Sequence, residues 1–129
     1  MANEYLERYE LNEKEKVHIV LIWGTFASEA EWVQKGSFFR TTLRRILKGF
    51  GVDCEFHIFS WSGVNSHVAR RDASSNLEGV LFDLSEKTKD DIFVVGHSHG
   101  GSVAYNALSN NPKLKSKVSR LFSLSLIHI

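Results

Sequence analysis

The sequence predicts an α/β domain built on a parallel sheet of about four strands, with helices on both faces. Apolar runs rich in β-branched residues alternate along the chain with segments of helical periodicity, as in folds whose parallel strands are joined by helical crossovers. Residues 17–23 are almost entirely apolar, which is typical of a strand covered on both faces. A glycine-rich turn at 96–101 connects a later apolar run, residues 91–95, directly to a helix.

Residues 17–23 are the first predicted strand, and Gly24 ends it. A loop then leads to Ser37, whose hydroxyl is suited to cap a helix N-terminus. The helix that follows has apolar residues at helical spacing, namely Phe39, Leu43, Ile46, Leu47 and Phe50. Gly49 and Gly51 are its predicted stop.

Residues 54–59 are the second predicted strand, and a polar loop over 60–66 follows it. The second helix carries an apolar stripe made of Ala69, Ala73, Leu77, Val80, Leu81 and Leu84. After the third strand, 91–95, the third helix must end before Pro112, because proline does not continue a helix. A fourth strand is predicted from Val118 to about Leu124.

Composition argues against several classes of protein. A hydrophobic content of 43% with 24% charged residues is ordinary for a globular domain. The formal net charge is +1 and the basic residues are scattered, so we expect no nucleic-acid partner. No apolar run approaches the roughly 20 residues of a membrane-spanning helix, so no transmembrane segment is expected.

The N-terminal residues and the cysteine favour a cytoplasmic location. Residues 1–16 mix acidic and basic side chains and lack the apolar stretch of a secretory signal, so we interpret them as a charged leader. The single cysteine, Cys54, lies inside an apolar strand pattern and is interpreted as a small buried hydrophobe.

Ser98 is the strongest candidate for a catalytic nucleophile in the sequence. A serine hydroxyl becomes a useful nucleophile when a tight strand-to-helix turn exposes it near a base and near oxyanion donors. Such a turn leaves no room for a Cβ two positions before and two after the serine, and Gly96 and Gly100 occupy those positions. The alternatives are a plain connecting turn or a phosphate-binding loop, but neither a Gly-x-Gly-x-x-Gly motif nor a P-loop ending is present.

With its Gly-His-Ser-His-Gly-Gly motif at 96–101, the chain resembles the α/β-hydrolase superfamily, in particular its lipase-like or esterase-like members. The resemblance covers roughly residues 17–123, which it identifies as the N-terminal part of a hydrolase domain. It implies a sheet of strand order 2-1-3-4. It also implies an oxyanion hole formed by the backbone N–H of His99 and that of Thr25 or Phe26. Trp23 departs from the family's usual histidine at this loop, and an ordinary turn at Gly24 is the alternative.

A second polar cluster follows the second strand. Trp61, Asn65 and Arg70 lie at or just beyond its carboxyl end, where they are candidates to line a pocket or to bond the oxyanion loop. The alternative is a helix cap at Asn65 or Ser66 with a solvated arginine.

The other two members of a catalytic triad are not found after Ser98. The resemblance implies the order serine, acid, histidine, yet no Asp or Glu follows Asp91, and the later histidines are His99 and His128. His97 and His99 flank the serine in a turn that aims them away from it. His18 and His57 are expected to be core or edge residues, and His67 a surface or cap residue, which leaves no base.

We therefore expect a gene fragment that is inactive by itself. Residues 124–129 resemble the translation of a transposon-end sequencing adaptor, so they are expected to be a non-native tail. The expected function of the intact protein is hydrolysis of small-molecule or lipid esters through an acyl-enzyme on Ser98, with no metal and no organic cofactor. The alternatives are an acyltransferase or thioesterase that uses the same serine, and a non-catalytic α/β domain that binds a ligand.

Overall fold

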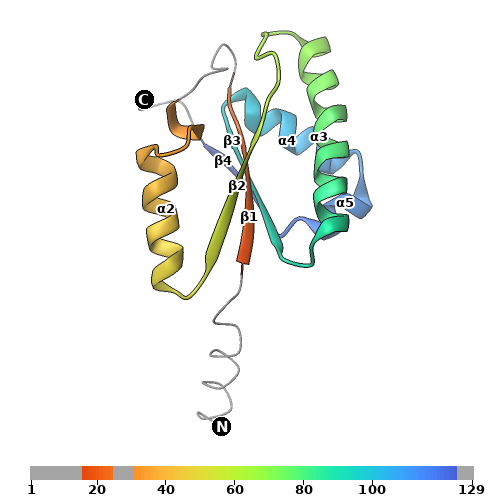
Figure 1. Ribbon diagram of the computed structural model, residues 1–129. Coiled ribbons are helices and arrows are strands. Elements are labelled where there is room, and N and C mark those ends of the chain that lie inside the picture. Colours follow the sequence, from red (N-terminus) through yellow and green to blue (C-terminus); the bar gives the residue numbers. More distant parts are fainter. Residues whose placement is uncertain (1–15, 25–30, 125–129) are drawn as a thin grey trace.

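The computed structural model describes residues 16–24 and 31–124, and these form one parallel sheet with helices on both sides (Figure 1). The strands are β1 (Lys16–Ile22), β2 (Asp53–Phe59), β3 (Asp91–His97) and β4 (Arg120–Leu124). Their order is β2-β1-β3-β4 and every pair is parallel. The predicted fold class and strand order are therefore confirmed.

The helices lie on both faces of the sheet, as predicted. They are a 3-10 helix η1 (Glu31–Val33), α2 (Phe38–Gly49), α3 (His67–Lys87), α4 (His99–Ser109) and α5 (Pro112–Lys117). Helix α2 covers one face, and α3, α4 and α5 lie on the other (Figure 1). Within the described residues, no helix is long and apolar enough to cross a membrane.

Two serines begin the two longest helices. The Ser37 hydroxyl accepts a hydrogen bond from the Arg40 backbone N–H at 3.2 Å. The Ser66 hydroxyl does the same for the N–H of Ala69 at 3.0 Å. Each hydroxyl satisfies a backbone donor that the first helical turn leaves without a partner, which stabilises the helix by about 1 kcal/mol.

Helices α5 and η1 were not predicted. Asn111 caps α5 by accepting a hydrogen bond from the Leu114 N–H at 3.1 Å, and Pro112 occupies the first turn, where its missing N–H costs nothing. The same proline that ends one helix thus begins the next.

Two strand boundaries also differ from the prediction. Strand β3 continues two residues further, to His97, because Gly96 pairs with Ile22 on one side and with Ser123 on the other. Strand β4 starts at Arg120 and includes Leu124, which pairs with His97 although it was placed in the predicted tail.

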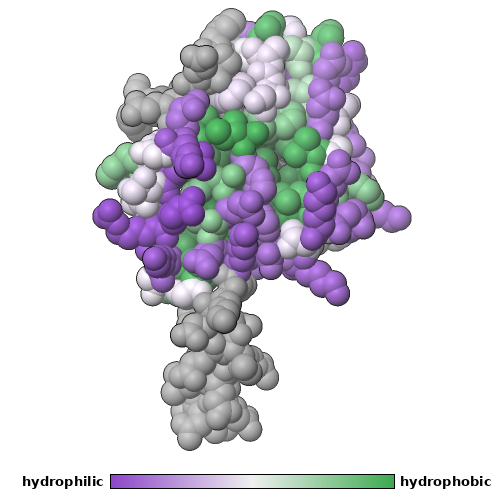
Figure 2. Space-filling model, in the orientation of Figure 1, coloured by the Kyte–Doolittle hydropathy of each residue, from purple (hydrophilic) through white to green (hydrophobic). Residues whose placement is uncertain are grey.

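The core is centred on β1, which other strands flank on both sides. Every residue from Val17 to Trp23 is buried, in contrast to the alternating exposure of the edge strand β2. Leu77 and Leu81 of α3 are fully buried, and each such side chain stabilises the fold by about 1.5–3 kcal/mol. On the face shown in Figure 2, hydrophobic residues gather between more hydrophilic borders. Cys54 is 6% exposed, as the prediction of a buried thiol requires.

Candidate active site

Ser98 lies at the carboxyl edge of the sheet, in the turn between β3 and α4. Its backbone angles are φ 57° and ψ −123°, and it is the only non-glycine residue with positive φ in the described part of the chain. The Gly101 N–H closes the turn on the Ser98 carbonyl at 2.9 Å. A non-glycine residue with such backbone angles destabilises the fold by about 1–3 kcal/mol, so the surrounding structure must impose this conformation.

The glycines on either side of Ser98 allow close contact between backbones. A Cβ on Gly96 would lie 2.5 Å from the Gly101 nitrogen. A Cβ on Gly100 would collide with the carbonyl oxygens of Ile22 and Trp23 at the end of β1. The glycine requirement inferred from the motif therefore corresponds to two specific contacts, and the second ties the turn to the neighbouring strand.

Gly24 lies directly against the candidate nucleophile. A Cβ at this position would be 2.9 Å from the His97 carbonyl oxygen and 3.2 Å from the Ser98 Cβ. The sequence indicated only a strand break here, whereas the structure gives Gly24 a steric role beside Ser98. Thr25 and Phe26, the candidate oxyanion donors, lie outside the described residues.

Two tryptophans hold the start of this loop. The Trp61 indole N–H donates to the Trp23 carbonyl oxygen at 2.9 Å, and the Trp23 indole N–H donates to the Trp61 carbonyl oxygen at 3.2 Å. Both side chains are buried. Trp61 therefore bonds the backbone just after β1, immediately before Gly24.

Asn65 and Arg70 form a separate surface pair. The Arg70 guanidinium donates to the Asn65 side-chain oxygen at 2.8 Å, while Ser66, and not Asn65, caps the helix. Arg70 also lines a partly polar cavity of about 540 Å³ together with His67, His99, Tyr105 and Ser123. Trp61 borders a different hollow, with Ser62 and Val64. Arg70 and Trp61 therefore line different cavities, and Asn65 lines neither of these two.

The histidines beside Ser98 differ in their surroundings. His97 is 8% exposed, and within the described residues its Nε2 has no hydrogen-bond partner. Its ring packs edge-on against Trp32, with 6.0 Å between the ring centroids. His99 begins α4 and is half-buried. The wholly apolar cavity of about 340 Å³ lies elsewhere, between α2 and the sheet, where Ile19, Phe93, Val95 and Phe122 line it.

The fold and this turn define a class of protein: a parallel α/β domain with a serine held in a strained strand-to-helix turn at the carboxyl edge of its sheet. A family model described as Mbeg1-like matches residues 54–125, more than half of the 129 residues, so the chain belongs to the Mbeg1-like family. The match runs from β2 through β4 and includes Ser98. No curated protein and no solved structure matches the chain significantly.

Proposed function

We propose that Ser98 is the nucleophile of a serine hydrolase that cleaves carboxylic esters, of the lipase or esterase type. The observation that carries the proposal is the positive φ of Ser98 in a turn whose flanking glycines have no room for a Cβ. Backbone strain of this kind gathers at functional sites, because the strained residue must be held in one working orientation. The resemblance of residues 96–101 to the nucleophile turn of α/β-hydrolases supports the same role.

The proposed reaction proceeds through an acyl-enzyme. The Ser98 Oγ attacks the ester carbonyl carbon and passes its proton to a general base. When the tetrahedral intermediate collapses, the bond to the alkoxy oxygen breaks, and the base returns the proton to that oxygen so that it leaves as the alcohol. The backbone N–H of His99, at the first residue of α4, donates to the developing oxyanion, which the positive end of the helix dipole also favours. The second donor is Thr25 or Phe26, a role that the contact of Gly24 with Ser98 supports. Water then hydrolyses the acyl-enzyme, and no metal or organic cofactor takes part.

The proposal assigns the general base and the orienting acid to residues outside this sequence. His97 is buried against Trp32, and no acidic residue follows Ser98 in the chain. The 129-residue chain by itself is accordingly expected to turn over esters very slowly or not at all. The proposed substrates are small-molecule or lipid esters, and the proposed compartment is the cytoplasm.

Active-site labelling tests this function. The longest reading frame that contains these residues is expected to react covalently with a fluorophosphonate probe, and Ser98→Ala is expected to abolish the reaction. Ser102→Ala is the matched control, because Ser102 is an exposed serine one turn further along α4. Equal labelling of the Ser98→Ala variant would refute the proposal. Absence of labelling in both proteins would favour the non-catalytic binding domain.

A further inference from the structure

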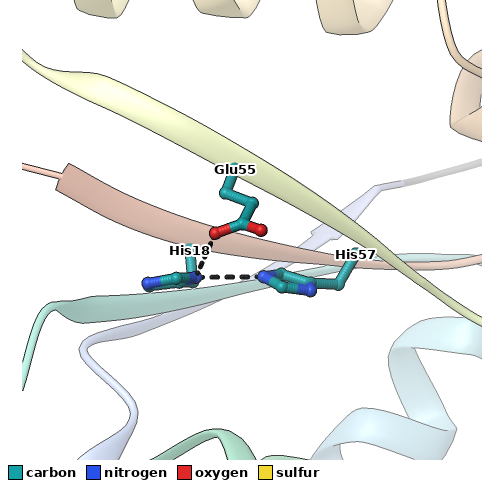
Figure 3. A group of neighbouring side chains, drawn as sticks. All are labelled: His18, Glu55 and His57. Atoms are coloured by element: carbon teal, nitrogen blue, oxygen red, sulfur yellow. Dashed lines mark hydrogen bonds and ion pairs between the residues drawn. The ribbon is translucent and has the colours of Figure 1, made fainter. Parts of the chain in front are cut away.

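A second cluster of reactive side chains lies toward the opposite end of the sheet from Ser98. His18 of β1 and Glu55 and His57 of β2 point toward one another (Figure 3). The His18 Nδ1 lies 3.0 Å from the His57 Nε2 and 3.5 Å from the Glu55 Oε2. One ligand atom from each of the three residues lies within 4.8 Å of the other two.

The sheet itself fixes this convergence. In the parallel register His18 pairs with Glu55 and Val20 pairs with His57, so the three side chains come from adjacent positions on two hydrogen-bonded strands. Glu55 and His57 are two residues apart and therefore share one face of β2. Because backbone pairing holds the Cα atoms, forming the cluster requires little further ordering of the chain.

Asp90 orients the most buried of these side chains. The His18 Nε2 lies 3.2 Å from the Asp90 Oδ2, and the His18 side chain is 8% exposed. An ionised carboxylate only accepts hydrogen bonds, so Asp90 is suited to hold a proton on the His18 Nε2, while the His18 Nδ1 is the ring nitrogen that faces Glu55 and His57. A carboxylate behind a histidine in this way is the usual outer contact of a metal-binding imidazole.

We propose that His18, His57 and Glu55 bind a divalent transition-metal ion, with Zn²⁺ as the best match. Two imidazole nitrogens and one carboxylate favour Zn²⁺ and its neighbours over Mg²⁺ or Ca²⁺, which prefer all-oxygen ligands. Zn–N bonds of about 2.0–2.1 Å at tetrahedral angles place two ligand nitrogens roughly 3.3 Å apart. The observed separation of 3.0 Å requires an adjustment of a few tenths of an ångström, and the Glu55 side chain is 47% exposed, which leaves an open path for the ion.

Lys16 opposes metal binding, so substitution of this lysine provides a specific test of the proposed site. Its Nζ lies 3.0 Å from the Glu55 Oε2, the same oxygen that faces His18. The bound ion must displace this ammonium group or tolerate its positive charge nearby. Removing the charge therefore strengthens binding, whereas removal of a surface lysine that only stabilised the fold would not.

The site would act as a cross-link between strands and takes no part in ester hydrolysis. His18 lies four residues before Ile22, which pairs with Gly96, so about 13 Å of strand separates the ion from the level of Gly96. An ion held by both strands would fasten the edge strand β2 to the centre of the sheet. This inference is independent of the function proposed for Ser98.

Metal titration of the untagged, chelator-treated protein tests the site. We expect Zn²⁺ to bind with one-to-one stoichiometry and to raise the melting temperature, and Co²⁺ to give the visible absorption of a tetrahedral nitrogen and oxygen site. His57→Gln and Glu55→Gln should each weaken Zn²⁺ binding at least tenfold. Asp90→Asn should weaken it by about 10-fold or more. Lys16→Met should strengthen it several-fold.

His67→Gln is the matched control, because His67 is an exposed histidine at the start of α3. Its Zn²⁺ affinity should equal that of the parent protein. Circular dichroism of each metal-free variant separates loss of a ligand from loss of the fold. If folded His57→Gln and Glu55→Gln bind Zn²⁺ as tightly as the parent, or if the parent binds none, the site is refuted.

Discussion

The indole N–H of Trp61 donates to the carbonyl oxygen of Trp23, and the indole N–H of Trp23 donates to the carbonyl oxygen of Trp61. This reciprocal pair joins the end of β1 to the loop after β2 and buries both rings. It also fixes the backbone that leads into Gly24, whose missing side chain leaves space for Ser98. Ser98, which follows β3, is thus linked through the end of β1 to Trp61, which follows β2 two strands away in the sheet.

Trp61→Phe is expected to lower the free energy of unfolding by about 1–3 kcal/mol, because the buried Trp23 carbonyl loses its donor. Urea denaturation followed by circular dichroism measures the change. Trp32→Phe is the control, since within the described residues the Trp32 indole nitrogen has no hydrogen-bond partner. An equal loss in both variants would mean that the reciprocal bonds contribute nothing beyond ring packing.

Gly100→Ala is expected to destabilise the fold by about 2 kcal/mol or more, because its Cβ would lie 2.4 Å from the Trp23 carbonyl oxygen and 2.5 Å from that of Ile22, so the backbone must shift. Gly79→Ala is the matched control in the middle of α3, where a Cβ has no neighbour within 4 Å. That variant should gain up to about 1 kcal/mol from the better helix propensity of alanine. Thermal melting should show a lower melting temperature for Gly100→Ala and a higher one for Gly79→Ala than for the parent protein. An unchanged melting temperature for Gly100→Ala would contradict the packing described for the turn.

Ser98→Gly should be more stable than Ser98→Ala by about 1 kcal/mol, since glycine adopts a φ of 57° without the steric cost borne by other residues. Both substitutions remove the hydroxyl, so the difference between them isolates the backbone strain. The corresponding pair at Ser102, inside α4, should have the reverse order because glycine weakens a helix interior. Chemical denaturation of all four variants gives the comparison, and equal stability of the two Ser98 variants would argue against a strained turn.

Cys54 is expected to react slowly with a disulfide reagent such as DTNB in the native protein and rapidly in denaturant. The thiol is buried, and burial raises its pKa above the ordinary value for cysteine. The thiolate is the reactive form, so a raised pKa lowers the reactive fraction near pH 8, and the native rate should keep increasing as the pH rises further. Stopped-flow absorbance across this pH range measures the rate. Native reactivity equal to that of free cysteine would contradict the burial of Cys54 in β2.

Much of the fold follows from patterns that are local in the sequence. The almost entirely apolar run at 17–23 predicts a strand flanked on both sides, and Ser37 predicts the start of α2. The turn at Ser98 could also be predicted, because the serine and the glycines two positions before and after it form a motif that is local in the sequence. Helix α5 was missed since Pro112 was interpreted only as an end, although Asn111 before it is a good cap.

The sequence by itself determined the succession of the four strands and the three longest helices, and also the serine turn, because spacings of two to four residues encode these features. The tertiary structure alone decided which distant side chains meet. Trp23 and Trp61 are 38 residues apart, and His18 and His57 are 39 apart. Their contacts depend on the register of β1 against β2, where a shift of one residue would turn these side chains to the opposite face of the sheet.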